Sequence, residues 1–189
     1  MKNQGTREVL RYWDGLRKGR AVPERGDIEP FRLKRVLSSL FMLECFDGDH
    51  FVFRLAGTQL CELYGREFRA HNFLSLWRGT DRFRMRDFLT DALRIPAPGL
   101  ILCRAETFDR LAIDMEVLVL PIADRSKSVC RLLGCMQAVT NPDILGSRRL
   151  VNQWILELRH IDPAREPELV GGRKSERKHL RLIVSRPDA

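Results

Sequence analysis

Residues 51–77 read FVFRLAGTQLCELYGREFRAHNFLSLW and place a short apolar strand directly before a series of interrupted helical turns. Phe51, Phe53 and Leu55 alternate with their neighbours, which predicts a strand with one buried face. Thr58 provides an N-cap for the first helical turn, and Gly65 interrupts the helical pattern before a further short helix. A strand that leads directly into short helices indicates a mixed α+β layer architecture.

The segments on either side of this stretch complete the predicted sheet. An Asp-Gly-Asp turn at residues 47–49 joins two apolar runs and predicts a hairpin. Residues 80–95 have the pattern of a longer helix, and proline and glycine residues follow it. The predicted strands are residues 40–46, 50–56, 100–108, 111–122 and 129–139. Together they predict a five-stranded antiparallel sheet with short helices on one face.

Residues 7–18 predict an amphipathic N-terminal helix with two aromatic side chains on its apolar face. Val9, Tyr12, Trp13 and Leu16 recur at helical spacing, and charged residues occupy the other face. Two explanations stay open: the helix packs on the outer face of the sheet, or it pairs with a second copy of itself. Because buried aromatic side chains are typical interface anchors, these four residues are the predicted interface of a homodimer.

The chain divides into four predicted regions. Residues 1–35 form the helix and an ordered connector, residues 36–140 the core, and residues 141–162 a C-terminal extension. Residues 163–189 are rich in proline, glycine and charge, which predicts a flexible tail. Two segments stay undecided: residues 153–161 fit a strand or a helix, and residues 179–185 fit an edge strand or part of the tail.

Composition indicates a globular protein of the cytoplasm. The 189 residues are 44% hydrophobic and 31% charged, which is ordinary for a folded domain. No apolar run approaches the roughly 18–20 residues that span a bilayer, and the N-terminus lacks the apolar region of a signal peptide. We therefore expect no membrane segment and a cytoplasmic location.

Charge and cysteine usage disfavour two further classes of function. The net charge of +8 is spread along the chain, and acidic residues are interleaved with the basic ones, so a nucleic-acid partner is disfavoured. The five cysteines are odd in number and show no C-x-x-C spacing. They lie inside apolar patterns, which predicts buried structural thiols rather than a zinc or redox site.

Several sequence words resemble one family of small stand-alone bacterial PAS-like domains, formerly described only as a domain of unknown function. The words are YWDGLRKGRAVPERGDIEP at 12–30, FMLE at 41–44, FRLAGTQLCELYGRE at 53–67, FLSLW at 73–77 and RLLG at 131–134. The resemblance implies a PAS fold and a sensory or protein-interaction module that acts as a dimer in bacterial signalling. It supplies no ligand, because this fold hosts many ligands or none.

The cofactors of related sensors do not match these residues. Residues 69–76 correspond to the flavin-binding word of light sensors but contain no cysteine, so flavin is disfavoured. The helix at residues 80–95 contains no histidine, which disfavours haem. The four histidines share no spacing typical of a metal site. No cofactor is therefore predicted, and an unknown small molecule stays an open alternative.

Apolar and aromatic side chains are the candidate lining of a ligand pocket. They are Phe53, Leu55, Tyr64, Phe68, Phe73, Trp77, Phe83, Phe88, Met115 and Val117. The other interpretation is that these side chains simply fill the core of a small domain.

No catalytic constellation is present in the sequence, so we expect no enzyme activity. It has no G-x-S-x-G, H-E-x-x-H or phosphate-binding glycine motif. Asp114 and Glu116 share one face of a strand, a pattern that more often marks solvent exposure than a carboxylate pair. The prediction is a non-enzymatic cytoplasmic PAS-type sensory module that binds a small apolar or aromatic ligand and relays through contact with a signalling protein. The alternatives are a ligand-free interaction scaffold and, third, a nucleic-acid-associated regulator.

Overall fold

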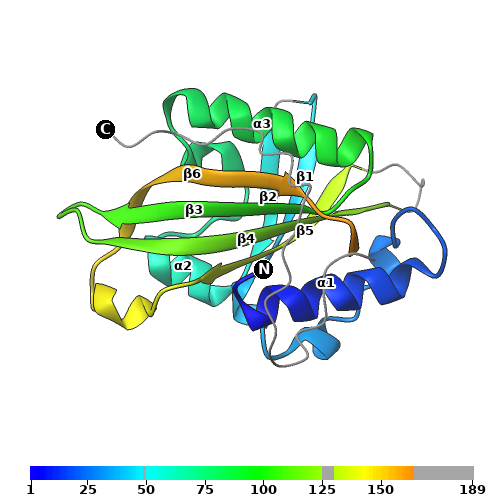
Figure 1. Cartoon of the computed structure of the whole chain (residues 1–189), viewed down its shortest axis with the longest axis horizontal. Helices are drawn as coiled ribbons and strands as arrows, with labels where there is room; N and C mark the ends of the chain where they lie inside the picture. Colours follow the sequence, from blue (N-terminus) through cyan, green and yellow to red (C-terminus); the bar gives the residue numbers. More distant parts are fainter. Residues whose placement is uncertain (49, 125–129, 164–189) are drawn as a thin grey trace, which may run out of the picture.

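A computed structural model describes residues 1–48, 50–124 and 130–163 of the chain. Its antiparallel sheet has six strands in the order β2-β1-β5-β4-β3-β6 (Figure 1). The strands are β1 (Leu40–Phe46), β2 (His50–Ala56), β3 (Gly99–Thr107), β4 (Ala112–Ile122), β5 (Arg131–Ala138) and β6 (Leu150–His160). The predicted α+β class and the β1–β2 hairpin are confirmed, whereas the predicted number of five strands is wrong by one.

The additional strand, β6, comes from the segment that fitted either a strand or a helix. It pairs with β3 along its whole length, but the register shifts twice and skips Val151 and Leu156. These two residues are 46% and 39% exposed. Each bulge breaks the alternation of buried and exposed residues, so the sequence of β6 lacks the period of a regular strand.

Helices lie on both faces of the sheet. The α-helices are α1 (Gln4–Arg17), α2 (Thr58–Tyr64) and α3 (Gly79–Arg94). Short 3₁₀ turns are η1 (Arg25–Asp27), η2 (Pro30–Leu33), η3 (Leu37–Ser39), η4 (Phe73–Leu76) and η5 (Pro142–Leu145). Figure 1 draws α3 above the sheet and α1 below it. The sheet is therefore the middle layer of the domain.

Two hydrophobic clusters correspond to the two faces. The inner cluster packs β-strand residues against α2, η4 and α3, and includes Phe53, Met85 and Val117. The outer cluster packs the other strand face against α1 and the connector, and includes Trp13 and Leu118. Alternation along β4 explains the division, because Val117 and Leu118 are neighbours on opposite faces.

Local capping fixes the ends of α1. The side chain of Asn3 accepts a hydrogen bond from the backbone N–H of Gly5, and Lys18 adopts the left-handed conformation at the C-cap with φ 49°. The helix thus runs over Gln4–Arg17, against the predicted 7–18. No helix in the described part of the chain is long and apolar enough to cross a membrane.

One carboxylate links three strands. Glu44 on β1 makes ion pairs with Arg54 on β2 and, at 2.8 Å, with Arg131 on β5. Burial alone would raise the pKa of Glu44, but the hydrogen bonds from Arg131 and Arg54 outweigh it and hold the pKa below its usual value.

The predicted division of the chain into regions stays a prediction. The extension at 141–162 contributes η5 and the edge strand β6, so the sheet continues beyond residue 140. The predicted tail from residue 164 onward, with the undecided segment 179–185, lies outside the described residues.

Candidate functional site: the inner core and the N-terminal cover

Aromatic rings fill the space between the sheet and the short helices. Phe53 lies 4.8 Å from Phe68, and Phe41 stacks on Phe73 at 5.6 Å between ring centroids. The backbone fixes this arrangement, because Phe53 donates a hydrogen bond to the carbonyl of His71 at 3.0 Å and accepts one from Ala70 at 2.9 Å. The rings therefore belong to a packed core built around β2.

Eight of the ten candidate pocket residues are buried. They are Phe53, Tyr64, Phe68, Phe73, Trp77, Phe88, Met115 and Val117, and all belong to the inner cluster. The structure thus brings them together, as both the pocket and the filled-core interpretations require. Ligand binding by these residues stays a prediction.

The other two candidates do not line the core. Leu55 is 43% exposed, because the register of β1 and β2 shifts between Met42 and Leu43 and reverses the alternation beyond Phe53. Phe83 is 58% exposed, since it lies off the buried stripe of α3. It lines an open surface depression of about 280 Å³ instead. The pocket prediction is wrong for both residues.

Polar side chains are also buried in the inner core. Tyr64 donates a hydrogen bond to Oε1 of Gln153 at 2.5 Å. Burial raises the pKa of the Tyr64 phenol well above its usual value, and burial also raises the pKa of the Cys103 thiol. Both groups therefore stay protonated at neutral pH. Sequence reasoning missed Gln153 because it lies in the bulged strand β6, whose type was undecided.

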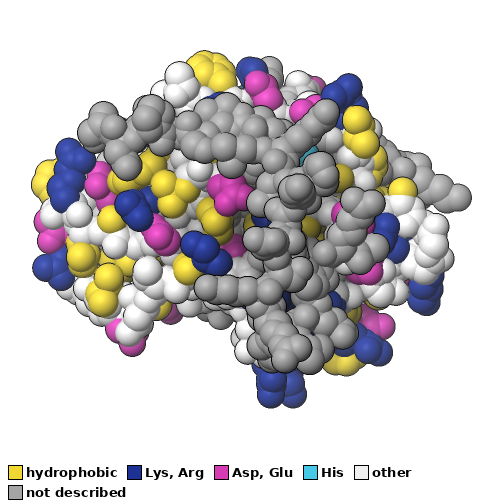
Figure 2. Space-filling view, in the orientation of Figure 1, with side chains coloured by type: hydrophobic (Ala, Val, Ile, Leu, Met, Phe, Trp, Pro, Cys, Tyr) yellow, Lys and Arg dark blue, Asp and Glu magenta, His cyan; other side chains and the backbone are white. Residues whose placement is uncertain are grey.

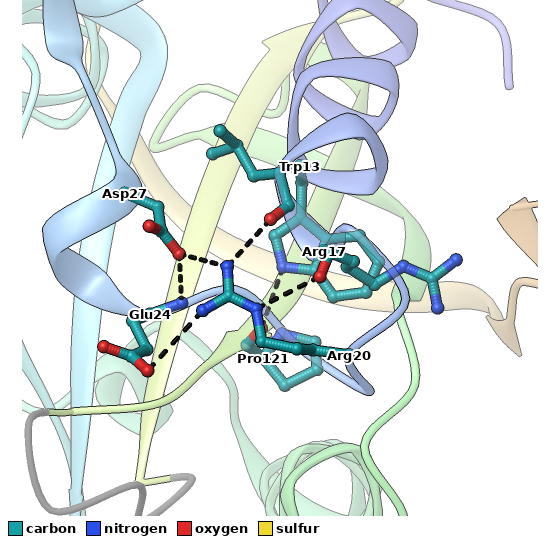
Figure 3. Close-up of polar contacts among 7 residues, drawn as sticks. Trp13, Arg17, Arg20, Glu24, Asp27 and Pro121 are labelled. Atoms are coloured by element: carbon teal, nitrogen blue, oxygen red, sulfur yellow. Dashed lines mark hydrogen bonds and ion pairs between the residues drawn. The ribbon is translucent and has the colours of Figure 1, made fainter.

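On the outer face, α1 is part of the fold. Val9 and Trp13 are 0% and 1% exposed, and Trp13 Nε1 donates to the carbonyl of Pro121 at 2.8 Å (Figure 3). The apolar face of α1 therefore packs on the outer face of the sheet, which is the first of the two explanations that the sequence left open. The prediction that Val9 and Trp13 form an interface is therefore corrected: their side chains are used within the chain. Tyr12 and Leu16 stay partly exposed.

Arg20 joins the end of α1 to the connector. Its guanidinium donates to the carbonyls of Leu16 and Arg17 at 3.0 and 3.1 Å and to Asp27 at 2.5 Å (Figure 3). Asp27 also accepts from the backbone N–H of Glu24. This backbone hydrogen bond, together with Arg20, lowers the pKa of the Asp27 carboxyl. The sequence did not single out Arg20, because only the fold of the connector shows its hydrogen-bond partners.

The connector itself is paired with the sheet. Arg25 donates its backbone N–H to the carbonyl of Ala123 at 2.8 Å, and Ala123 donates to Pro23 at 3.0 Å. The Pro-x-Arg-x-Asp word at residues 23–27 is thus an anchor for the N-terminal cover, defined here as residues 1–39.

A buried carboxylate holds the start of α1. Glu116 on β4 is 0% exposed and accepts hydrogen bonds from the backbone N–H groups of Lys2 at 2.6 Å and Asn3 at 3.0 Å, and from the hydroxyl of Thr6. Asp114, two residues earlier, forms a partly exposed ion pair with Arg104. The expected solvent exposure is therefore wrong for Glu116, whose partners are a helix terminus and not water.

The other groups with reactive chemistry are the cysteines and possible metal ligands. Among the described residues, no group of three or more His, Cys, Asp or Glu side chains is placed to hold a metal ion. Cys103 and Cys135 are buried, and burial raises the pKa of Cys135 to about 12; the other three cysteines are partly exposed. Figure 2 shows basic and acidic side chains interleaved over the face that it draws.

Comparisons with known proteins come from sequence and from structure. No curated protein sequence matches the chain. A Light-Oxygen-Voltage domain studied with a flavin analogue has a TM-score of 0.46 at 12% identity, over 58% of this chain and 82% of that one. The LOV protein of Rhodobacter sphaeroides gives 0.44 at 16%, over 56% and 61%. A PAS domain from Colwellia psychrerythraea gives 0.43 at 11%, over 58% and 97%.

A family model described as PAS domain, PAS_5, matches residues 1–137. This range includes the N-terminal cover, the aromatic core, the strands β1 to β4 and all of β5 except Ala138. The resemblance drawn from the sequence words is confirmed, and the chain belongs to the PAS domain family.

Proposed function

We propose that the chain is a non-enzymatic sensory and interaction module of bacterial signalling, which works in the cytoplasm and relays through contact with other proteins. Membership of the PAS family supports the sensory class. Fold alone does not determine function, so the proposal has to be argued from particular residues.

The packed aromatic core is the observation that carries the proposal. Phe41, Phe53, Phe68 and Phe73 contact one another with centroid distances of 4.8–5.7 Å. At this spacing the rings are in direct contact, so side chains fill the space on the inner face of the sheet. A large chromophore would have to displace them, whereas a protein contact requires no internal space. Relay by surface contact therefore fits this core better than binding of a flavin-sized or haem-sized group.

The N-terminal cover offers a surface for such a contact. Phe31 in η2 is 69% exposed, although it is a large apolar side chain. Tyr12 of α1 accepts a hydrogen bond from the backbone N–H of Glu29 at 2.7 Å, which holds the segment with Phe31 beside α1. Leu16, four residues after Tyr12, lies on the same side of α1. The three apolar side chains of Tyr12, Leu16 and Phe31 are here called the N-terminal surface. Exposed aromatic residues are common anchors of interfaces, and we propose that this surface contacts a signalling protein or, in a homodimer, a second chain.

The test compares two exposed phenylalanines. Tagged full-length chain would be cross-linked in cells of its source and captured, and the co-purified proteins quantified. We expect a signalling protein to be enriched, and Phe31→Ser to lower its recovery at least about tenfold, since truncation of an interface anchor costs about 2 kcal/mol. Phe108→Ser is the matched control, because Phe108 is 92% exposed in the β3–β4 turn, away from the cover.

Equal recovery with both variants would contradict the proposed surface. Failure to enrich any signalling protein over the tag alone would contradict relay by protein contact. Melting curves of both variants confirm that each is folded, as expected for changes at exposed positions.

A further inference from the structure

Three polar side chains meet in the otherwise apolar inner core. Tyr64 ends α2, Trp77 follows η4, and Gln153 belongs to β6. Their exposed fractions are 8%, 2% and 3%. Tyr64 and Trp77 were candidate pocket residues, and Gln153 joins them only through the strand that the sequence left undecided.

Two hydrogen-bond donors in this group have no partner within residues 1–48, 50–124 and 130–163. The Tyr64 hydroxyl donates to Oε1 of Gln153 at 2.5 Å and lies 3.8 Å from the sulfur of Met136. Nε2 of Gln153 and Nε1 of Trp77 are inaccessible to solvent and bond to no atom of the residues that the structure describes. More than about nine in ten buried polar groups in folded proteins have a partner, so two orphaned donors in one core indicate a missing acceptor.

The backbone directs both donors into the same space. Trp77 and Gln153 form an isolated parallel bridge, and residues opposite each other in such a bridge project to the same face. Both side chains belong to the inner side of the sheet, since Tyr64 of the inner cluster bonds to Gln153 and Trp77 packs on Phe73 at 6.1 Å. One acceptor placed between the two chains can therefore serve both donors.

The surroundings select an uncharged acceptor. The neighbours Cys103, Met115, Met136 and Ile155 are buried and carry no charge. A charged group lies beside them, the buried carboxylate of Asp81, which accepts a hydrogen bond from the backbone N–H of Ile155 at 2.9 Å. A buried anion in this place would lose its hydration and lie near the Asp81 carboxylate, which is far more costly than burying a neutral dipole. A water molecule, or the carbonyl or hydroxyl oxygen of a small uncharged compound, meets both requirements.

We propose that Trp77 and Gln153, with Tyr64 orienting the Gln153 amide, form a buried binding site for one neutral hydrogen-bond acceptor. If the occupant is a small molecule, this site names the chemistry of the compound that the proposed sensory module detects. Only this sensory reading of the site rests on the proposed function. Its failure would leave partner capture through the N-terminal surface unaffected, so the two proposals can fail separately.

The direct test is a high-resolution crystal structure of the full chain, together with its native and denatured masses. We expect electron density about 2.7–3.2 Å from both Trp77 Nε1 and Gln153 Nε2. An isolated peak with no added mass identifies water, and density over several atoms with a mass lost on denaturation identifies a small molecule. Either result supports the site, whereas an interior without density between the two nitrogens overturns it.

Nuclear magnetic resonance gives a second readout that needs no crystal. The indole N–H of Trp13 donates to Pro121 and is the internal standard for a bonded indole. We expect the Trp77 indole proton to be shifted downfield as that of Trp13 is, and Gln153→Leu to move it while Gln137→Leu, on β5, leaves it unchanged. A Trp77 signal at the position of a free indole, unaffected by Gln153→Leu, would overturn the proposal even if the Leu variant were unstable.

Discussion

Replacing Trp13 with alanine separates a core role for α1 from an interface role. Trp13 is 1% exposed in the outer cluster, and its indole N–H is bonded to the Pro121 carbonyl at 2.8 Å. Truncating a buried tryptophan costs about 3–5 kcal/mol through lost burial and the cavity that remains. The orphaned Pro121 carbonyl adds about 1 kcal/mol. We therefore expect Trp13→Ala to lower the free energy of unfolding by about 4 kcal/mol or more.

Urea denaturation followed by far-ultraviolet circular dichroism measures this loss without relying on the deleted fluorophore. For a chain of this size, about 4 kcal/mol corresponds to a fall in melting temperature of roughly 8–16 °C. Trp13→Phe retains most of the packing and isolates the hydrogen bond, with an expected loss of about 1–2 kcal/mol. Arg11→Ala is the matched control on the same helix, because Arg11 is exposed.

The reasoning would be refuted by a Trp13→Ala variant with unchanged melting temperature and weaker self-association. That result would mean that the apolar face of α1 contacts a second chain and does not pack on the sheet of its own chain.

Three further predictions concern the sheet. Glu116→Ala should lower the free energy of unfolding by about 2 kcal/mol, because it removes the acceptor of the N–H donors at the start of α1. Asp114→Ala should cost less than about 1 kcal/mol in the same urea titration. Equal losses would contradict the role of Glu116 in holding the start of α1. Gly134→Ala would place a Cβ 2.0 Å from the Phe41 ring, so we expect a loss of about 1–3 kcal/mol, and a neutral melting curve would show that the ring moves freely. The pKa of Glu44 is lowered in the folded chain. Its contribution to stability is therefore present above its unfolded pKa of about 4.3 and is lost as the pH falls through the folded pKa. Glu44→Gln should flatten the pH dependence of the free energy of unfolding in that acidic range, and an unchanged slope would argue against the paired carboxylate.

Regular periodicity made much of the fold predictable. The β1–β2 hairpin follows from two alternating runs joined by an Asp-Gly turn, and α3 follows from its spacing and the prolines after it. The strand β6 was not decidable, because bulges at Val151 and Leu156 remove the two-residue period on which the prediction depends. The same cause, at the irregularity between Met42 and Leu43, made the pocket assignment of Leu55 wrong.

Long-range partners account for what the sequence could not predict at the site. The aromatic residues of the core were recognisable as apolar, and eight of the ten pocket candidates are buried. Nothing local distinguishes Gln153 from a surface residue, since its partner Tyr64 lies 89 positions away in the sequence. Arg20 differs, because its partner Asp27 is only 7 positions away and the irregular connector between them has no period to predict from. Glu116 likewise has the pattern of an exposed residue until the N-terminus folds onto it.

Native mass spectrometry of the freshly purified full chain, compared with its denatured mass, tests the packed core and the proposed homodimer most directly. The account predicts an assembly of two chains of 22.0 kDa each, with no flavin-sized or haem-sized adduct. A small uncharged compound remains compatible with the site at Trp77 and Gln153. A monomer at every concentration would contradict the proposed homodimer, and a chromophore-sized mass released on denaturation would contradict the packed core.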